Sequence, residues 1–197
     1  METFKDKDEK LRKIKEEVLN CQKCSLYRNR NYPVIGEGNH QAKIMFIGEA
    51  PGVQEDRTGR PFCGPAGKIL DELLNSAGIK REDVYISNLL KCRPPNNRDP
   101  QKEEIEACSP YLEKQIEIIS PKVICPLGRY SMQFLMEKFG LKEQIQPISK
   151  IHGKIFEVKN LFQNIKIIPF YHPAVATYNI NTKETLKRDF KILERFK

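Results

Sequence analysis

Four short apolar runs that alternate with helical patterns constrain the fold of this chain more than any other feature. The runs cover residues 43–48, 84–90, 122–127 and 165–171 and are typical of fully buried strands. Helical patterns lie at 66–77, 100–119, 129–139 and 182–196. This alternation predicts a three-layer α/β/α sandwich around a central, mainly parallel, four-stranded sheet. An amphipathic helix is expected over 6–20, and a further strand or hairpin over 151–158.

Length and composition favour one globular domain over residues 1–197. The chain is 39% hydrophobic and 30% charged, which suffices for a core without disulfides. It contains no run of roughly 20 apolar residues and no apolar signal-peptide core, so we expect a cytosolic protein that does not enter membranes. The net charge of +8 favours nucleic acid as a partner, and the alternative is a solvated surface rich in Lys and Glu.

Polar residues follow the predicted strands at the end where α/β sheets bind ligands. The loop 48–52 follows the first strand, Asn88 lies near the end of the second, and His172 follows the fourth. The carboxyl ends of parallel strands share one edge of the sheet. Glu49, Asn88 and His172 are therefore expected to meet in one pocket.

The six cysteines predict a metal or cluster site, because cytosolic thiols rarely form disulfides. Cys21 and Cys24 form a C-x2-C pair, and Cys92 and Cys108 are the best candidates for two further ligands. Cys125 lies in an apolar run typical of a core thiol, and Cys63 would be a ligand only in place of Cys92 or Cys108. Spacing alone leaves zinc and an iron–sulfur cluster equally open.

Four motifs together with the cysteine pair resemble the family 4 uracil-DNA glycosylases. The motifs cover 48–52, 59–67, 88–95 and 172–175, in that order. The resemblance implies a three-layer α/β/α enzyme of base excision repair that hydrolyses the N-glycosidic bond of uracil in single- or double-stranded DNA and leaves an abasic site. It also implies a 4Fe-4S cluster on Cys21, Cys24, Cys92 and Cys108. We expect a monomer.

The resemblance assigns roles in the pocket. Phe62 would stack on the uracil ring, and Asn88 would accept from uracil N3–H and donate to O4, a pattern that cytosine reverses. His172 would donate a hydrogen bond to the departing uracil anion. The expected uracil-binding residues are Gly48, Glu49, Ala50, Phe62, Asn88 and His172. The expected catalytic residues are His172, Glu49 and Asn88.

Two positions depart from the better-known enzymes of the superfamily. Ala50 stands where those enzymes have an aspartate, so it cannot activate water, and Glu49 and Asn88 remain as candidates. Gly52 stands where they have a tyrosine that excludes the methyl group of thymine. We expect Glu55 to fill that space.

The basic residues Lys91, Arg93 and Arg98 are expected to contact DNA phosphates beside the cysteine site. For each of them, a solvated charge is the alternative. A non-catalytic nucleic-acid-binding module, stabilised by zinc or a cluster, is the competing function. An iron–sulfur electron carrier is disfavoured because it leaves the pocket motifs without a role.

Overall fold

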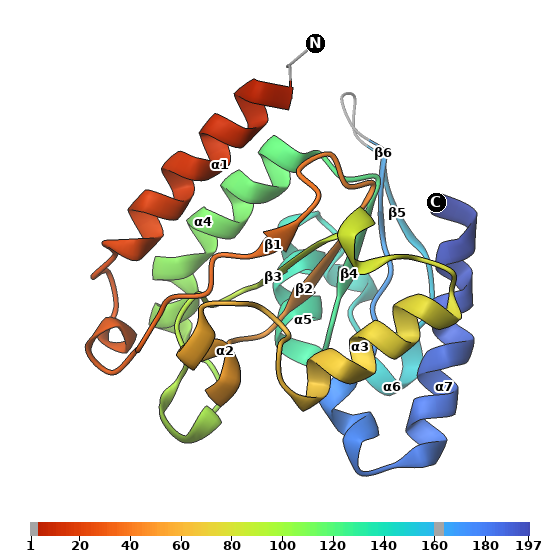
Figure 1. The fold of residues 1–197 in the computed structure, drawn as a ribbon. Helices are drawn as coiled ribbons and strands as arrows, with labels where there is room; N and C mark the ends of the chain where they lie inside the picture. Colours follow the sequence, from red (N-terminus) through yellow and green to blue (C-terminus); the bar gives the residue numbers. More distant parts are fainter. Residues whose placement is uncertain (1–3, 160–163) are drawn as a thin grey trace.

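The structure is a computed structural model and describes residues 4–159 and 164–197 (Figure 1). In this part of the chain the sheet has six strands in the order β1-β3-β2-β4-β6-β5. The strands are β1 (Glu37–Gly38), β2 (Ile44–Gly48), β3 (Tyr85–Asn88), β4 (Val123–Pro126), β5 (Phe156–Lys159) and β6 (Asn164–Ile167). Strands β2, β3, β4 and β6 are parallel, whereas β1 and β5 pair antiparallel at the two edges.

The mainly parallel sheet is confirmed, but the prediction of four strands is wrong. The four parallel strands are the four apolar runs of the sequence. Strand β1 spans only Glu37–Gly38, which is too short to show an alternating pattern. Helix α6 (Ile148–Ile151) ends at the start of the expected segment 151–158, so β5 begins only at Phe156.

The main helices are α1 (Phe4–Leu19), α2 (Val53–Thr58), α3 (Pro65–Ser76), α4 (Lys102–Ile119), α5 (Arg129–Lys138) and α7 (Ile180–Phe190). Most of them are those that the sequence predicts, but α2 is not among the expected ones. Short 3-10 helices include η1 (Ser25–Arg28), η3 (Pro95–Asn97) and η5 (Pro173–Thr177). Within the described residues, no helix has the length and apolar character needed to span a membrane.

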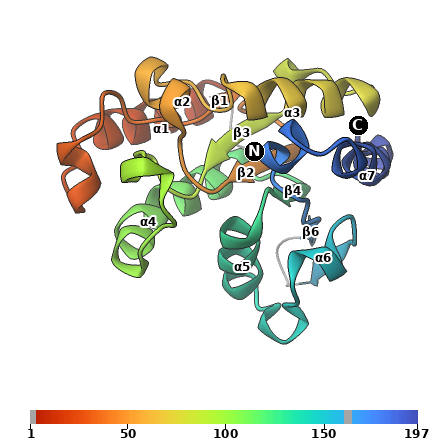
Figure 2. The same cartoon turned by 90° about the horizontal axis from the view of Figure 1, so that it is seen from below.

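Two apolar cores form because successive side chains of a strand point to opposite faces of the sheet. Along β2, Met45 and Ile47 pack in one core with residues of α1, α4 and α5. Ile44 and Phe46 pack in the other core with residues of α3 and α7. Figure 2 shows α3 and α7 on one side of the sheet and α5 on the other, so the three-layer architecture is confirmed.

The carboxyl ends of the parallel strands meet at one edge of the sheet. Gly48, the last residue of β2, is the register partner of Asn88, the last residue of β3. Beyond the ends of β4 and β6, Leu127 and Phe170 form a parallel bridge, which places His172 next to the same edge. The loops after these strands are therefore neighbours in space although they are far apart in the sequence.

Candidate active site and four-cysteine site

A pocket of about 570 Å³ opens at this edge of the sheet. Its wall includes every residue expected to bind uracil except Gly48, whose backbone lies beneath the pocket. The lining residues used below are Glu49, Ala50, Gly52, Glu55, Phe62, Asn88, Asn97, Arg98, His172, Ala174 and Tyr178. The convergence of Glu49, Asn88 and His172 on one pocket is confirmed.

Asn88 reaches the pocket because Gly48 has no side chain. A Cβ atom at Gly48 would collide with Asn88 Oδ1 and would lie 2.7 Å from Phe62 Cζ. Asn88 is only 2% exposed. Among residues 4–159 and 164–197, no group hydrogen-bonds to its side-chain amide, which lines the pocket and remains available to a ligand.

Phe62 adopts a left-handed backbone conformation with φ of 48°, which is strained for a bulky residue. Its backbone is held by close packing against Gly67, where a Cβ atom would overlap the Phe62 carbonyl. The Phe62 ring stacks on the His172 ring with a centroid separation of 5.6 Å and an interplanar angle of 29°. The strained backbone thus presents an aromatic face beside the imidazole.

Glu55 fixes the loop that carries Phe62. Its Oε1 accepts hydrogen bonds from the backbone N–H groups of Cys63 at 3.0 Å and Gly64 at 2.9 Å. Its Oε2 accepts from the Gly52 N–H at 3.1 Å, and a Cβ atom at Gly52 would lie 2.7 Å from that oxygen. The carboxylate therefore occupies the space where a side chain at position 52 would begin. Its expected role in excluding a methyl group stays a prediction.

His172 is held as a neutral hydrogen-bond donor. Its Nδ1 accepts a hydrogen bond from the Ala174 N–H at 3.2 Å, so the proton of the neutral ring is on Nε2. Burial lowers the pKa of His172 to about 4, and the negative charge of Glu55 opposes this shift only weakly. At neutral pH the ring is uncharged and can donate from Nε2.

Glu49 is an acidic residue of this pocket whose pKa is raised. Burial raises the pKa of Glu49 to about 6, the nearby Asp99 adds to the shift, and Arg129 opposes it. A carboxylate with this pKa can both bind and release a proton near neutral pH. Ala50 lines the pocket beside it and offers no acidic group.

Lys91 is not a DNA contact, so that prediction is wrong. The side chain is 1% exposed and donates hydrogen bonds to Ser87 Oγ, the Asn88 carbonyl oxygen and Gln115 Oε1. Burial lowers the pKa of Lys91 to about 8. Cys92 lies near the other cysteines, and the side chain of Lys91, the residue before it, points into the protein.

The other two basic residues keep partial access to solvent. Arg98 lines the pocket and forms a two-point ion pair with the buried carboxylate of Glu104. Arg93 donates through Nε to Asn97 Oδ1 at 2.7 Å. Contact of Arg93 and Arg98 with DNA phosphates stays a prediction.

Tyr178 is a pocket residue that the sequence analysis missed. It lies just after η5, lines the pocket and is 96% exposed. An aromatic residue six positions after His172 was the available signal. An exposed ring at the mouth of a pocket can stack on a base.

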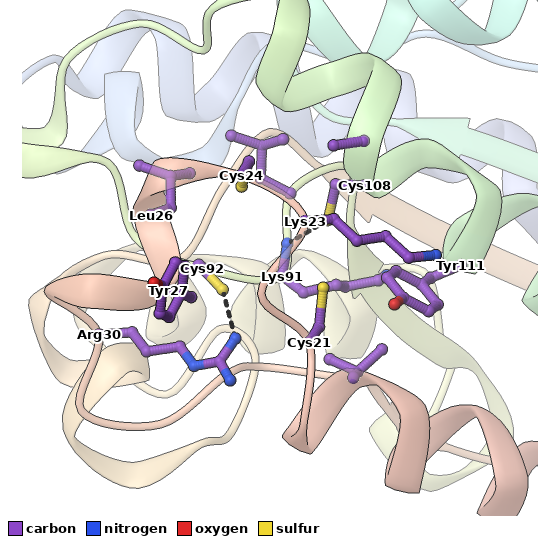
Figure 3. A pocket seen from close by; sticks show the side chains of 13 residues that line it. Cys21, Lys23, Cys24, Leu26, Tyr27, Arg30, Lys91, Cys92, Cys108 and Tyr111 are labelled. Carbon is purple, nitrogen blue, oxygen red and sulfur yellow. Dashed lines mark hydrogen bonds between the residues drawn. The ribbon is translucent and has the colours of Figure 1, made fainter.

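Cys21, Cys24, Cys92 and Cys108 line a second, small pocket (Figure 3). Cys21 and Cys24 lie between α1 and η1, Cys92 follows β3, and Cys108 lies in α4. Figure 3 shows the four side chains arranged around a common space. The grouping expected from the sequence is therefore observed.

The remaining two cysteines lie outside this pocket. Cys125 is fully buried in β4, as expected for a core thiol. Cys63 lies 3.2 Å from Thr58 Oγ1.

Polar donors and apolar side chains surround the four sulfur atoms. Arg30 Nη1 lies 3.3 Å from Cys92 Sγ, and the Lys91 backbone N–H donates to Cys108 Sγ at 3.2 Å. Burial raises the pKa values of Cys24 and Cys92, and that of Cys108 to about 12. The thiols of Cys24, Cys92 and Cys108 are therefore protonated unless a bound cation displaces their protons.

Four thiolates can hold either a zinc ion or an iron–sulfur cluster. In the part of the chain that the structure describes, no three His, Cys, Asp or Glu side chains converge closely enough to bind one metal ion. A tetrahedral zinc ion would need four sulfur atoms at about 2.3 Å from one point. An iron–sulfur cluster takes the same four thiolates but holds them further apart, because each binds a different iron atom.

Comparison with known proteins identifies the family to which this chain belongs. Residues 35–194 match the model of the uracil DNA glycosylase superfamily. A type-4 uracil-DNA glycosylase of Sulfurisphaera tokodaii is 50% identical over 92% of this chain and 82% of its own length. That of Archaeoglobus fulgidus is 48% identical, over 93% of this chain and 91% of its own length. A type-5 uracil-DNA glycosylase of Thermus thermophilus is 33% identical over 87% of this chain and 80% of its own length.

The chain therefore belongs to the uracil-DNA glycosylase superfamily, and within it to the type-4 group. The family that the motifs predict is confirmed.

Proposed function

We propose that this protein hydrolyses the N-glycosidic bond of uracil in DNA, releases uracil and leaves an abasic site for base excision repair. The observation that carries the proposal is the convergence of Asn88, Phe62 and His172 on one pocket. These residues supply the three functions that excision of a base requires, namely recognition of its edge, stacking on its face and stabilisation of the leaving group.

Asn88 distinguishes uracil from cytosine. A uracil flipped into the pocket places its N3–H and O4 against the carbonyl and amino groups of the Asn88 side chain, while Phe62 stacks on the ring. Cytosine presents an acceptor at N3 and a donor at its amino group. Each buried group left unpaired costs about 1–3 kcal/mol, which disfavours cytosine.

His172 assists departure of the base. When the bond between N1 of uracil and C1′ of the sugar breaks, the electron pair moves to uracil and its carbonyl oxygens gain negative charge. The neutral ring donates from Nε2 to this charge, and the Ala174 N–H keeps that nitrogen protonated. A preorganised donor of this kind is worth about 3–4 kcal/mol of barrier height.

Glu49 is the group that we assign to the attacking water. Its carboxylate orients the water that adds to C1′ and accepts the proton that this water loses. The raised pKa of Glu49, about 6, keeps most of the carboxylate ionised at neutral pH and leaves it basic enough to take the proton. We also expect the backbone N–H groups of Glu49 and Ala50 to donate hydrogen bonds to the carbonyl oxygens of uracil.

Glu55 excludes thymine in this proposal. Its carboxylate occupies the space beside Gly52, where a side chain would otherwise begin. A methyl group on C5 of the base would have to displace a carboxylate that already accepts three backbone hydrogen bonds.

Cys21, Cys24, Cys92 and Cys108 would hold a 4Fe-4S cluster. Its contribution is structural: it would join the segment after α1, the loop after β3 and helix α4, because hydrolysis of a glycosidic bond transfers no electrons. Arg30 and the Lys91 N–H would offset the negative charge of the thiolates.

Arg93 and Arg98 would bind DNA phosphates near the pocket. Because Arg98 is already paired with Glu104, Arg93 is the stronger candidate. An affinity for DNA that barely changes with added salt would contradict both phosphate contacts. We still predict that the protein is a monomer, forms one domain and resides in the cytosol.

The test uses matched oligonucleotides that contain one uracil, thymine or cytosine at the same position. Incubation with the cluster-loaded protein and alkaline treatment reveal any abasic site as a strand break. We expect a break only at uracil. No product from a folded sample that binds DNA would instead favour the non-catalytic nucleic-acid-binding module.

A further inference from the structure

Lys91 is a buried ammonium group whose hydrogen bonds are all made inside the protein. Its Nζ lies 2.7 Å from Ser87 Oγ, 2.8 Å from the Asn88 carbonyl oxygen and 2.8 Å from Gln115 Oε1. A fully buried lysine is expensive unless each of its donors is satisfied. The three acceptors match the three N–H groups of the ammonium, so its position is closely defined.

The acceptors of Lys91 belong to a continuous buried network. Gln115 donates through Nε2 to the Ile35 carbonyl oxygen at 3.0 Å and to Tyr85 Oη at 3.2 Å. Ser87 Oγ also lies 3.0 Å from the Ile35 carbonyl oxygen. Strand β3, helix α4 and the segment before β1 are thereby joined behind the pocket, so the ammonium cannot shift without breaking several hydrogen bonds.

The backbone of Lys91 belongs to the four-cysteine site. Its N–H donates to Cys108 Sγ at 3.2 Å, and its carbonyl oxygen accepts from the Val34 N–H at 2.7 Å. Its side chain then runs back toward the end of β3 and bonds to the residue that reads the base. One residue thus connects the sulfur atom of Cys108 with the backbone of Asn88.

We propose that Lys91 is a positioning residue for base recognition: its ammonium, anchored at the cysteine site, holds the Asn88 carbonyl and thereby aims the Asn88 side-chain amide at uracil. The inference rests on the proposed function. Asn88 needs such support because its side-chain amide has no hydrogen bond within the described residues. Its orientation is set by the backbone that Lys91 holds.

The test is a double-mutant cycle with Lys91→Met and Asn88→Ala. Lys91→Met removes the ammonium, keeps the length of the side chain and leaves the backbone N–H on Cys108 Sγ. We expect it to lower the single-turnover rate on uracil DNA by about tenfold or more in the otherwise wild-type protein, but by less than about twofold in the Asn88→Ala background. DNA affinity and iron content should stay at the wild-type level in both.

A general loss of stability would give a different result. It would lower the rate by the same factor in both backgrounds, and that outcome overturns the proposal. Lys114→Met is the matched control, because Lys114 is an exposed neighbour of Gln115 that pairs with Glu17. Its rate should equal that of the wild type.

If Lys91→Met does not fold, Ser87→Ala provides the same test in milder form. It removes one acceptor of the ammonium and leaves Asn88 unchanged. We expect a loss of about threefold to tenfold that again disappears in the Asn88→Ala background. An unchanged rate would overturn the inference. Absence of uracil release by the wild-type protein would instead refute the proposed function, so the two failures are distinguishable.

Discussion

The backbone N–H of Ala174 donates a hydrogen bond to Nδ1 of His172 across 3.2 Å. This contact determines which nitrogen of the His172 ring carries the proton. It leaves Nε2 as the donor that the proposed reaction requires for the departing base. Proline at position 173 starts η5 and fixes the backbone angle that brings this N–H back over the ring.

Substitution of His172 by asparagine should slow the chemical step. Asparagine is too short to place a donor where Nε2 lies, so we expect the single-turnover rate to fall by about 100- to 1,000-fold. DNA affinity should change little, because the donor acts mainly in the transition state. A rate within about tenfold of the wild type, at wild-type DNA affinity, would contradict the role of His172.

The rate should depend on pH through Glu49. Because the carboxylate must be ionised to accept a proton and burial raises its pKa to about 6, the rate should fall below pH 6 and level off above it. Glu49→Gln should lower the rate and abolish this dependence. The pH profile of single-turnover rates measures both effects.

Asp99→Asn supplies the matched control for this profile. The negative charge of Asp99 adds to the raised pKa of Glu49, whereas Arg129 opposes it. Removal of the Asp99 charge should therefore shift the midpoint to lower pH. A midpoint that moves to higher pH would contradict the assignment of this pH dependence to Glu49.

Much of the pocket could be predicted from the sequence because each motif follows a strong signal. Asn88 lies near the end of one apolar run and His172 directly follows another, and parallel strands bring such positions to the same edge of the sheet. The cysteines were grouped by their spacing and by the polar surroundings of Cys92 and Cys108.

The errors concern side-chain direction and short edge elements. Lys91 lies in a basic segment that suggests DNA contact, but its Cα–Cβ bond points into the protein, toward a glutamine 24 positions away in the sequence. Nothing local to Lys91 signals Gln115. Likewise, β1 is too short to produce a pattern, and the hydrogen bond from Ala174 to His172 depends on the exact turn at Pro173.

Loss of the Glu55 carboxylate should affect both stability and selectivity. Glu55→Ala leaves three backbone N–H groups without their acceptor, at a cost of about 1–3 kcal/mol in the free energy of unfolding for each group that stays buried. It also opens the space beside Gly52, so cleavage of thymine-containing DNA should become measurable. If the variant still does not cleave thymine-containing DNA, Glu55 does not exclude the methyl group. Comparable cleavage of both bases by the wild type would exclude any methyl barrier.

The cysteine site should hold four iron atoms and four sulfide ions for each chain. Cys92→Ser should reduce iron and sulfide and lower the thermal stability, because three segments of the chain lose a common link. Cys63→Ser is the matched control, since Cys63 lies outside the four-cysteine pocket, and it should retain the full content. One zinc ion for each chain, without sulfide, would contradict the cluster.

The most direct test of the account measures free uracil released from one uracil-containing oligonucleotide by the wild-type protein and by Asn88→Ala. We predict stoichiometric release by the wild type. Asn88→Ala should be slower by about 100-fold, because two hydrogen bonds to the base are lost. Equal release by the two proteins would contradict base recognition by Asn88, and no release by folded, cluster-loaded wild-type protein would contradict the proposed reaction itself.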